Sequence, residues 1–244
     1  MGGKCEIRSG LELNMWRFLL HLLYKIKNMT RILIAFLMLL TACGSGKKVD
    51  HLLEEVWNKD QAVRHKMAEL TKAVTIEGCI EKVDSLLIIN ELKDCIDAEN
   101  VEIVEKVLLN GLPKNLSRDS YRTIWGVIDH SPLPTQERYL PIVKQMAEGG
   151  LIEADEYAIL LDRIAMRRGR LQRFGSQVVQ YGTPGEIYAY VYPIENPEIL
   201  DSLRTSVGLS PMAEYLDQVS TIIGVDVKYD PTLTIEKLEK LQNQ

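Results

Sequence analysis

Apolar side chains recur at helical spacing along most of the chain. Over 49–73 they fall near a period of 3.6 residues, which predicts an amphipathic helix. After a break around Gly78, apolar positions three and four apart predict a second helix over 83–96. A third helix is expected over 98–109, because the Asn-Gly-Leu-Pro sequence at 110–113 combines a helix-ending glycine with a proline.

Three more helices are expected in the middle of the chain, each with a start or stop signal. Ser117 is a suitable N-cap for a helix over 117–128, in which apolar and aromatic side chains share one face. Two prolines then precede a helix expected over 135–148, which a Gly-Gly pair ends. The next helix is expected over 153–168 and again ends at a glycine.

The C-terminal part of the chain changes character. β-Branched and aromatic runs on either side of a Thr-Pro-Gly turn predict one β-hairpin near 173–192. Tyr188, Tyr190 and Tyr192 alternate and therefore share one face of the hairpin. This tyrosine stripe is either a recognition surface for peptide or glycan, or it packs on the helices. Two later prolines are expected at the first positions of short helices. We therefore predict a mostly α fold: a single helical domain over 49–244, with about seven to nine helices and this one hairpin.

A different pattern precedes the helical domain. A short positive start at 29–31 is followed by nine apolar residues at 32–40. This run is shorter than the about 20 residues that a transmembrane helix needs, but it suits a secretory signal peptide. The sequence Leu-Thr-Ala-Cys that ends at Cys43 resembles the lipobox of bacterial lipoproteins. The resemblance implies cleavage before Cys43 and acylation of its thiol and new amine, so that lipid anchors the protein to a membrane.

The lipoprotein interpretation divides the chain into an upstream extension at 1–28, a signal peptide at 29–42, a polar tether at 43–48 and the helical domain. It predicts a location in the bacterial cell envelope, at the outer membrane. The alternative is an uncleaved signal anchor over 15–40. Lysine and arginine side chains interrupt that stretch, and charge in the middle of a membrane span is costly.

The charge balance argues against nucleic acid as a partner. The whole chain has 29 basic and 34 acidic residues, a net charge of −5. Removing 1–42 takes away six basic and two acidic residues, which leaves 23 basic against 32 acidic and a net charge of −9. An acidic surface without a basic stripe disfavours nucleic acid and anionic lipid headgroups. The expected partners are the membrane, through the lipid on Cys43, and an envelope protein, peptide or glycan.

The cysteines and histidines show no metal-binding spacing. Cys79 and Cys95 are an even pair that an oxidising envelope would allow to form a disulfide, and the alternative is two buried thiols. His51, His65 and His130 share no spacing of a helical zinc motif. We therefore expect no metal and no cofactor.

Several polar motifs follow one another along the chain. They are Asp60-Gln61 with Arg64, Gly111-Leu112-Pro113, His130 with Gln136, Asp162-Arg163, Gly169, Gln172, Phe174-Gly175-Ser176-Gln177, residues 193–197, and Arg204 with Gly208-Leu209. The set resembles a bacterial family of unknown function whose members carry DQxxR, GWP, QH, DRxxxxxGxxQxYGTQ and PIxDP motifs. The resemblance spans about 55–217, and it implies a set of polar positions without an assigned reaction.

The sequence departs from the family pattern at three places. Leu112 stands where GWP has tryptophan, and Asp129 stands where glutamine precedes the histidine. Phe-Gly-Ser-Gln at 174–177 replaces YGTQ. A literal Gln-Tyr-Gly-Thr occurs at 180–183, but its distance from the preceding motif is wrong, and we assign it to the hairpin.

The polar positions support two interpretations. The first is a structural network of charge pairs across helices and of glutamines that satisfy backbone groups. Its members are Asp60, Arg64, Asp162 and Arg163, with Gln61, Gln172 and Gln177. The second is a ligand pocket made of the same candidate residues, in which Arg64 or Arg163 binds a carboxylate or phosphate. If that pocket is catalytic and does not only bind a ligand, His130 would be its general acid or base, oriented by Asp129 or Asp162.

We therefore expect a lipid-anchored envelope protein that acts as a binding or assembly module. The alternative is a hydrolase-like enzyme centred on His130, although no serine lies in a nucleophile motif. An enzyme needs His130 in a cleft with a positioned partner, whereas a binding module needs only an exposed surface.

Overall fold

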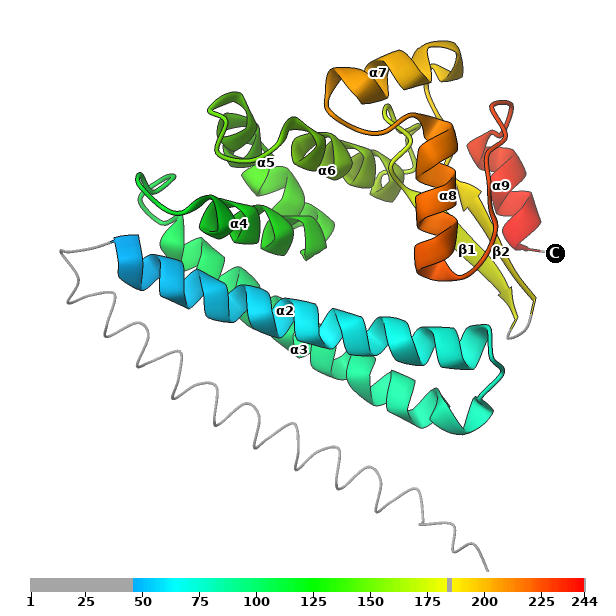
Figure 1. Cartoon of the computed structure of the whole chain (residues 1–244), viewed down its shortest axis with the longest axis horizontal. Coiled ribbons are helices and arrows are strands. Elements are labelled where there is room, and N and C mark those ends of the chain that lie inside the picture. The colour runs from blue at the N-terminus through cyan, green and yellow to red at the C-terminus, as the bar shows by residue number, and fades with distance from the viewer. Residues whose placement is uncertain (1–45, 184–185, 244) are drawn as a thin grey trace, which may run out of the picture. The chain divides into compact units, whose positions relative to one another are not determined.

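The computed structural model of the chain describes residues 46–183 and 186–243 (Figure 1). The predicted extension at 1–28, the signal peptide at 29–42 and the acylated Cys43 lie outside these residues and stay predictions. In the described part of the chain, no helix has the length and apolar character that a membrane span requires.

Two long helices lie side by side as an antiparallel pair (Figure 1). Helix α2 spans Gly46–Thr75 and α3 spans Val83–Val107. The one-turn 3-10 helix η1 (Ile80–Lys82) connects them. Apolar side chains on the facing sides are buried along α2, among them Leu53 and Val56.

Two expectations for this region are wrong. Helix α3 is continuous, whereas a break between 83–96 and 98–109 was expected. The helix continues because no glycine or proline occurs within it. Residues 46–48, which were expected to belong to the tether at 43–48, instead form the first turn of α2, and 43–45 lie outside the described residues.

Cys79 and Cys95, the cysteines of the described residues, form no disulfide with each other. Cys79 precedes η1 at the tip of the helical pair, and Cys95 lies well inside α3. Helical rise places Cys95 roughly 18 Å along α3 from its start, whereas a disulfide requires Cα atoms within about 7 Å. A disulfide between Cys79 and Cys95 is therefore excluded. The alternative, two buried thiols, is also wrong, because both residues are half-exposed.

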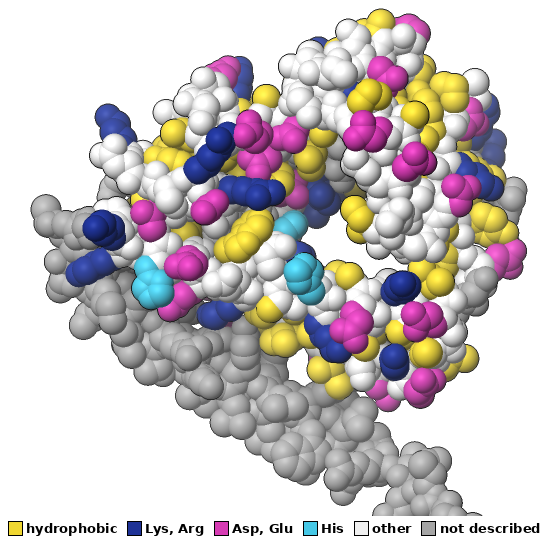
Figure 2. Space-filling view, in the orientation of Figure 1, with side chains coloured by type: hydrophobic (Ala, Val, Ile, Leu, Met, Phe, Trp, Pro, Cys, Tyr) yellow, Lys and Arg dark blue, Asp and Glu magenta, His cyan; other side chains and the backbone are white. Residues whose placement is uncertain are grey.

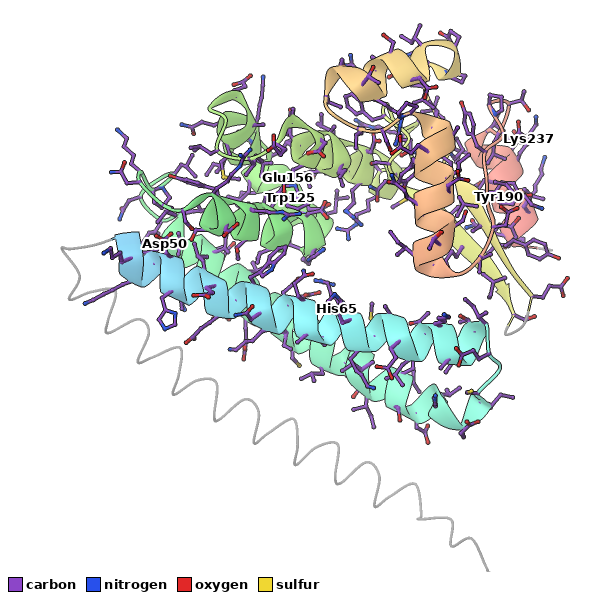
Figure 3. All side chains as sticks on the ribbon, in the orientation of Figure 1. Asp50, His65, Trp125, Glu156, Tyr190 and Lys237 are labelled. Atoms are coloured by element: carbon purple, nitrogen blue, oxygen red, sulfur yellow. The ribbon has the colours of Figure 1, made fainter. Side chains whose placement is uncertain are left out.

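Three shorter helices follow: α4 (Arg118–His130), α5 (Leu133–Glu148) and α6 (Ala154–Arg167). Helix α4 packs on the α2–α3 pair, and α5 and α6 pack on each other and on α4. Ser117 caps α4 as predicted, since its hydroxyl accepts from the backbone N–H of Ser120. Helix α5 begins two residues earlier than expected because Pro132 is its N-cap. The Trp125 indole N–H donates to the carbonyl of Glu156 at 2.7 Å and so ties α4 to α6 (Figure 3).

A small sheet follows the helices. Strands β1 (Val178–Thr183) and β2 (Glu186–Val191) pair antiparallel, so the hairpin expected near 173–192 is confirmed. Its turn residues 184–185 lie outside the described residues. Strand β3 (Val227–Lys228) joins β2 in parallel and gives the order β1-β2-β3. The sequence did not predict β3, because two residues carry no alternation pattern.

The remaining elements are short. They are η2 (Pro197–Ile199), α7 (Leu200–Ser206), α8 (Met212–Ile223) and α9 (Ile235–Gln242). Pro197 begins η2 as predicted, whereas Pro211 is the N-cap of α8 and not its first residue. Gly224 ends α8 with φ 73°, and a Cβ there would lie 2.9 Å from Cδ1 of Ile76. The end of α8 therefore touches the tip of the α2–α3 pair.

The described residues contain eight α-helices and this small sheet, which confirms the predicted mostly α fold. Helices α2 to α6 share a core that includes Leu53, Ile124, Met146 and Leu160. A second core lies where one face of the sheet packs on α7 and α8, around Val191.

The tyrosine stripe lies on the other face of the sheet. Tyr181 stacks with Tyr188 and Tyr190 at ring distances of 5.6 and 6.1 Å. Tyr192 is buried against Leu238 of α9. The inner end of the stripe therefore packs on a helix, and its outer end stays accessible at Tyr188, which is 39% exposed.

Candidate functional site

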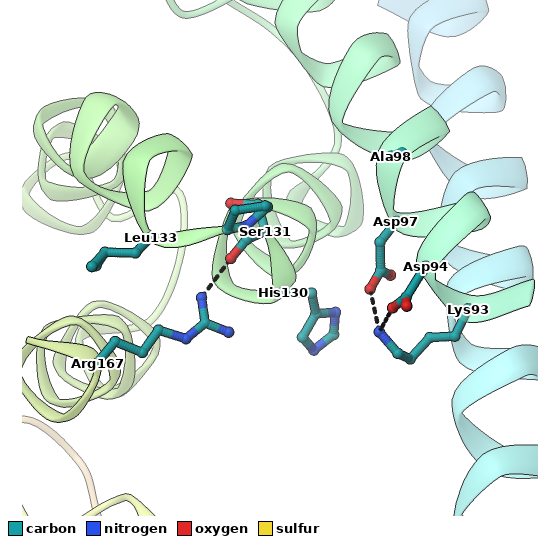
Figure 4. Close-up of a pocket in the computed structure, with 9 residues that line it drawn as sticks. Lys93, Asp94, Asp97, Ala98, His130, Ser131, Leu133 and Arg167 are labelled. Carbon is teal, nitrogen blue, oxygen red and sulfur yellow. Dashed lines mark hydrogen bonds and ion pairs between the residues drawn. The ribbon is translucent and has the colours of Figure 1, made fainter. Parts of the chain in front are cut away.

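A cleft of about 570 Å³ opens between α3, the α4–α5 connection and α6 (Figure 4). Its lining consists of Lys93, Asp94, Asp97, Ala98, His130, Ser131, Pro132, Leu133 and Arg167. In the space-filling view, histidine and basic side chains lie beside a hollow in the visible face (Figure 2). The volume is that of an ordinary small-molecule site.

The end of α4 places His130 in the cleft. His130 is the last residue of that helix, and Ser131 and Pro132 continue with ψ values of 166° and 151°. Proline disfavours a helical conformation in the residue before it, so the chain leaves α4 and begins α5 within two residues. The His130 ring therefore stands between Arg167 and Lys93, with 26% of its side chain exposed (Figure 4).

Asp60 of α2 contacts the other side of the imidazole. Its Oδ1 atom lies 3.3 Å from Nδ1 of His130. Arg64 Nε donates to both carboxylate oxygens of Asp60 at 3.1 and 3.0 Å, and Gln61 Nε2 donates to one of them at 3.0 Å. Burial acts to raise the pKa of Asp60, but the contacts with His130 and Arg64 hold that pKa below its ordinary value. The carboxylate therefore stays ionised beside the ring.

A chain of charge pairs continues from Arg64 into α3. Arg64 Nη2 donates to Oδ1 of Asp97 at 2.6 Å. Lys93 Nζ contacts Asp97 at 3.0 Å and Asp94 at 2.7 Å. Burial acts to lower the pKa of Lys93, but the two carboxylates outweigh it and the pKa is raised. On this wall of the cleft, the positive charges of the basic side chains are therefore balanced by neighbouring carboxylates.

Two arginines one turn apart on α6 differ in their partners. Arg163 Nε donates to the buried Asp129 carboxylate at 2.8 Å. Arg167 Nη1 donates to the carbonyl oxygen of Ser131 at 2.5 Å, and no carboxylate of the described residues forms an ion pair with it. Burial lowers the pKa of Arg167, the charge of Arg163 lowers it further, and Asp129 opposes both. Arg167 is an exposed cation at the cleft that forms no ion pair with a carboxylate of the described residues.

Asp162 holds the loop after α6 and does not line the cleft. It is 1% exposed, and its carboxylate accepts backbone N–H bonds from Arg173, Phe174 and Ser176 at 2.8 to 3.1 Å. Burial outweighs these bonds and raises the pKa of Asp162. The expectation that Asp162 pairs with an arginine across helices is therefore wrong.

Glutamine side chains hold the same loop. Gln172 Oε1 accepts from the N–H of Gln177 at 2.8 Å, and its Nε2 donates to the carbonyls of Gln177 and Tyr192 at 3.1 and 2.6 Å. Gln177 Nε2 contacts the carbonyl of Ile159 at 3.5 Å. Both glutamines satisfy backbone groups, as the structural interpretation expected, whereas the Gln61 amide goes to a side chain.

Arg204 completes the support of this loop. Its guanidinium is fully buried and donates to the carbonyls of Phe174, Gly175 and Ser210 at 2.7, 3.2 and 2.6 Å. It also lies 4.5 Å from the ring centroid of Tyr215. Asp162 therefore accepts from the N–H groups of the loop, and Arg204 donates to its carbonyl groups.

The structure brings only part of the predicted set together. His130 lines the cleft, and Arg64 lies behind it on Asp60. The carboxylate beside His130 is Asp60, so the expectation that Asp129 or Asp162 orients the ring is wrong. The candidates that do not line the cleft are Gln61, Arg64, Asp162, Arg163, Gln172 and Gln177.

Sequence reasoning missed Lys93 and Arg167, two basic residues of the cleft lining. Arg167 follows Arg163 by four residues, which places both on one face of a helix. That spacing is a usable signal for Arg167. Lys93 precedes Asp97 by four residues, but no local pattern connects that pair to His130.

The lining limits the chemistry that the cleft offers. The Ser131 hydroxyl is buried and donates to the carbonyl of Ile128 at 2.6 Å, so it is not directed at His130. Among residues 46–183 and 186–243, no cluster of three histidine, cysteine or acidic side chains is placed to hold a metal ion. What remains is anion binding by Arg167 and proton exchange at His130.

Comparison with known proteins gives one family. The family model described as "Family of unknown function (DUF6624)" matches residues 50–228. This range contains the cleft and the loop after α6 that Asp162 and Arg204 hold. Neither the curated proteins nor the solved structures contain a match to the chain.

Proposed function

We propose that this chain, which belongs to the DUF6624 family of unknown function, is a binding module whose cleft takes up an anionic group, a carboxylate or a phosphate. The observation that carries the proposal is Arg167, a guanidinium in the cleft lining whose one described hydrogen bond goes to the carbonyl of Ser131. Arginine has five N–H donors in a planar fork that matches carboxylate and phosphate oxygens.

The charge balance of the site supports this assignment. The carboxylates of Asp60, Asp97 and Asp129 each contact a basic side chain already. Arg167 has no such partner among the described residues, and Arg163 next to it adds positive charge. An anion at this position would accept hydrogen bonds from the remaining N–H donors of Arg167 and balance its charge.

The cleft also has features that would select a ligand larger than a simple ion. Its volume of about 570 Å³ exceeds that of one phosphate or carboxylate group. Ala98, Pro132 and Leu133 contribute apolar side chains to the lining, and the His130 ring stands beside Arg167 (Figure 4). We propose a ligand with an anionic group at Arg167 and an apolar or neutral body against these side chains.

The test is a calorimetric titration of the full-length chain with inorganic phosphate and, separately, with acetate. The variant Arg167→Gln should weaken binding about tenfold or more, because a charge-assisted hydrogen bond contributes about 1.5–3 kcal/mol. Arg168→Gln is the matched control, since Arg168 is exposed and pairs with Glu137 outside the cleft lining. Equal binding by the two variants would reject the proposal, and the two anions separate phosphate from carboxylate specificity.

The cellular setting of this module follows from the N-terminal sequence pattern. We propose that the protein is anchored in the bacterial cell envelope by lipid on Cys43, with 29–42 removed as a signal peptide. An acidic module held at a membrane by lipid would meet envelope peptides, proteins or glycans, and an acidic group on such a partner is what the cleft would bind.

A further inference from the structure

The contact between Asp60 and His130 determines which ring nitrogen of the histidine can act as a base. An ionised carboxylate only accepts hydrogen bonds, so the Nδ1 atom at 3.3 Å from Asp60 must carry the proton. In the neutral imidazole the other nitrogen, Nε2, is then unprotonated and basic. The ring projects into the cleft between Arg167 and Lys93 (Figure 4). Nε2 of His130 is therefore a base in the same cleft as the Arg167 guanidinium.

Water is the nucleophile that this arrangement can activate. Ser131 contributes the one hydroxyl side chain of the described lining, and that hydroxyl is buried against the carbonyl of Ile128. Neither Cys79 nor Cys95 belongs to the lining. A water molecule between His130 and a bound substrate would lose a proton to Nε2 as it attacks.

The single unpaired guanidinium restricts the class of substrate. An ester must keep a negative charge to be held by Arg167, and a carboxylic ester has none on its reacting group. A phosphodiester keeps one negative charge, which the one guanidinium of Arg167 matches. A phosphomonoester carries close to two charges at neutral pH and would leave the second unmatched.

We infer that the cleft hydrolyses phosphodiesters, with Arg167 binding the phosphoryl oxygens and His130 acting as the general base; the inference rests on the proposed anion site. Water attacks phosphorus and forms a new P–O bond while His130 Nε2 accepts its proton. The P–O bond to one alcohol then breaks, and the imidazolium returns the proton to the departing oxygen. One diester and one water give one monoester and one alcohol, so atoms and charge balance.

Asp60 has a positioning role in this reaction, because it contacts His130 and does not line the cleft. It fixes the ring tautomer and would stabilise the imidazolium that forms during the step. Arg64 holds Asp60 through both carboxylate oxygens and so fixes the carboxylate itself.

The experiment measures release of 4-nitrophenolate from bis(4-nitrophenyl) phosphate by the full-length chain, with EDTA present to silence contaminating metallophosphoesterases. Wild type should turn over this probe, and His130→Gln should lower kcat about 100-fold or more, the usual contribution of general acid–base catalysis. His65→Gln is the matched control, because His65 is an exposed histidine of α2 outside the cleft lining (Figure 3). It should retain the wild-type rate.

Asp60→Asn supplies a second readout. It should lower kcat with little change in KM and alter the pH dependence of kcat, which a merely structural role would not do once circular dichroism shows a folded variant. No turnover by wild type, or equal rates for His130→Gln and wild type, would overturn the inference. Turnover of 4-nitrophenyl acetate without turnover of the diester would overturn the phosphodiester assignment.

Phosphate binding separates this inference from the proposed function. If Arg167→Gln abolishes phosphate binding and wild type hydrolyses nothing, the binding module stands and the catalytic inference fails. If Arg167→Gln binds phosphate as wild type does, the proposed anion site itself is rejected.

Discussion

Nδ1 of His130, at the end of α4, lies 3.3 Å from Oδ1 of Asp60, which occurs 70 residues earlier in the middle of α2. The contact joins two helices that have no local sequence relationship. It also connects the cleft to the buried charge pairs between α2 and α3, because Arg64 bridges Asp60 and Asp97. The stability of this part of the fold and the chemistry of the cleft therefore depend on the same carboxylate.

The first prediction concerns Asp60→Asn. The variant removes the charge that Arg64 and His130 contact, so we expect a loss of about 3 kcal/mol in the free energy of unfolding, measured in urea at pH 7. Asp217→Asn is the control, because that aspartate is exposed on α8. If the two variants unfold at the same urea concentration, Asp60 does not hold the helices together.

The same variant gives a pH dependence with a defined sign. The pKa of Asp60 in the folded protein is below its ordinary value of 3.8, so its stabilising contribution is complete above that value. The contribution is lost as the pH falls through the folded pKa. The stability difference between wild type and Asp60→Asn should therefore shrink as the pH falls below about 4. A difference that grows on acidification would contradict the lowered pKa.

The second prediction concerns the loop that Asp162 and Arg204 support from its two sides. Asp162→Ala leaves the backbone N–H groups of three loop residues without their buried acceptor, and we expect a loss of roughly 3 kcal/mol in unfolding free energy. Arg204→Lys replaces the planar fork that reaches three carbonyls and should cost a similar amount.

A double-mutant cycle tests whether Asp162 and Arg204 stabilise the same loop. The losses should not add, because once one side of the loop is released the other residue has less to stabilise. Strict additivity in urea unfolding would show that Asp162 and Arg204 act independently.

How far the sequence predicts the structure differs between local and distant features. Ser117 and the apolar face that follows it predict α4 correctly, and the β-branched and aromatic runs predict the hairpin of β1 and β2. Each of these depends on residues within one element. The continuity of α3 was missed because its apolar spacing shifts near Ala98, although no helix breaker is present.

The candidate site was less predictable, for physical reasons. His130 was found as a titratable residue at a helix end, but Asp129 was the nearest carboxylate in sequence, and in the structure Arg163 holds it. The actual partner, Asp60, is reached only after α2 and α4 pack together. The sequence predicts that Asp162 forms an ion pair, but its partners are backbone N–H groups of an irregular loop. The hydrophobic periodicity of the sequence does not indicate such contacts.

The third prediction concerns the membrane anchor. Cys43→Ser removes the thiol that the lipobox resemblance marks for acylation. When the two forms are expressed in a bacterium and fractionated, wild type should partition with membranes and the variant should be soluble or remain uncleaved. Intact-mass analysis of extracted wild type should show lipid on Cys43 and loss of 1–42. An unmodified Cys43 or a retained N-terminus would reject the lipoprotein interpretation.

The last measurement is a ¹⁵N NMR titration of the full-length chain with inorganic phosphate. It follows the Nε–H signals of arginine and the ring signals of histidine, assigned with Arg167→Gln and His130→Gln. Binding in the cleft predicts that the signals of Arg167 and His130 shift together and saturate with one dissociation constant, because the two side chains stand in one cleft (Figure 4). The signal of the exposed His65 should stay in place. Shifts of equal size at His65 and His130, or an Arg167 signal that does not move at saturating phosphate, would contradict an anion site at this position.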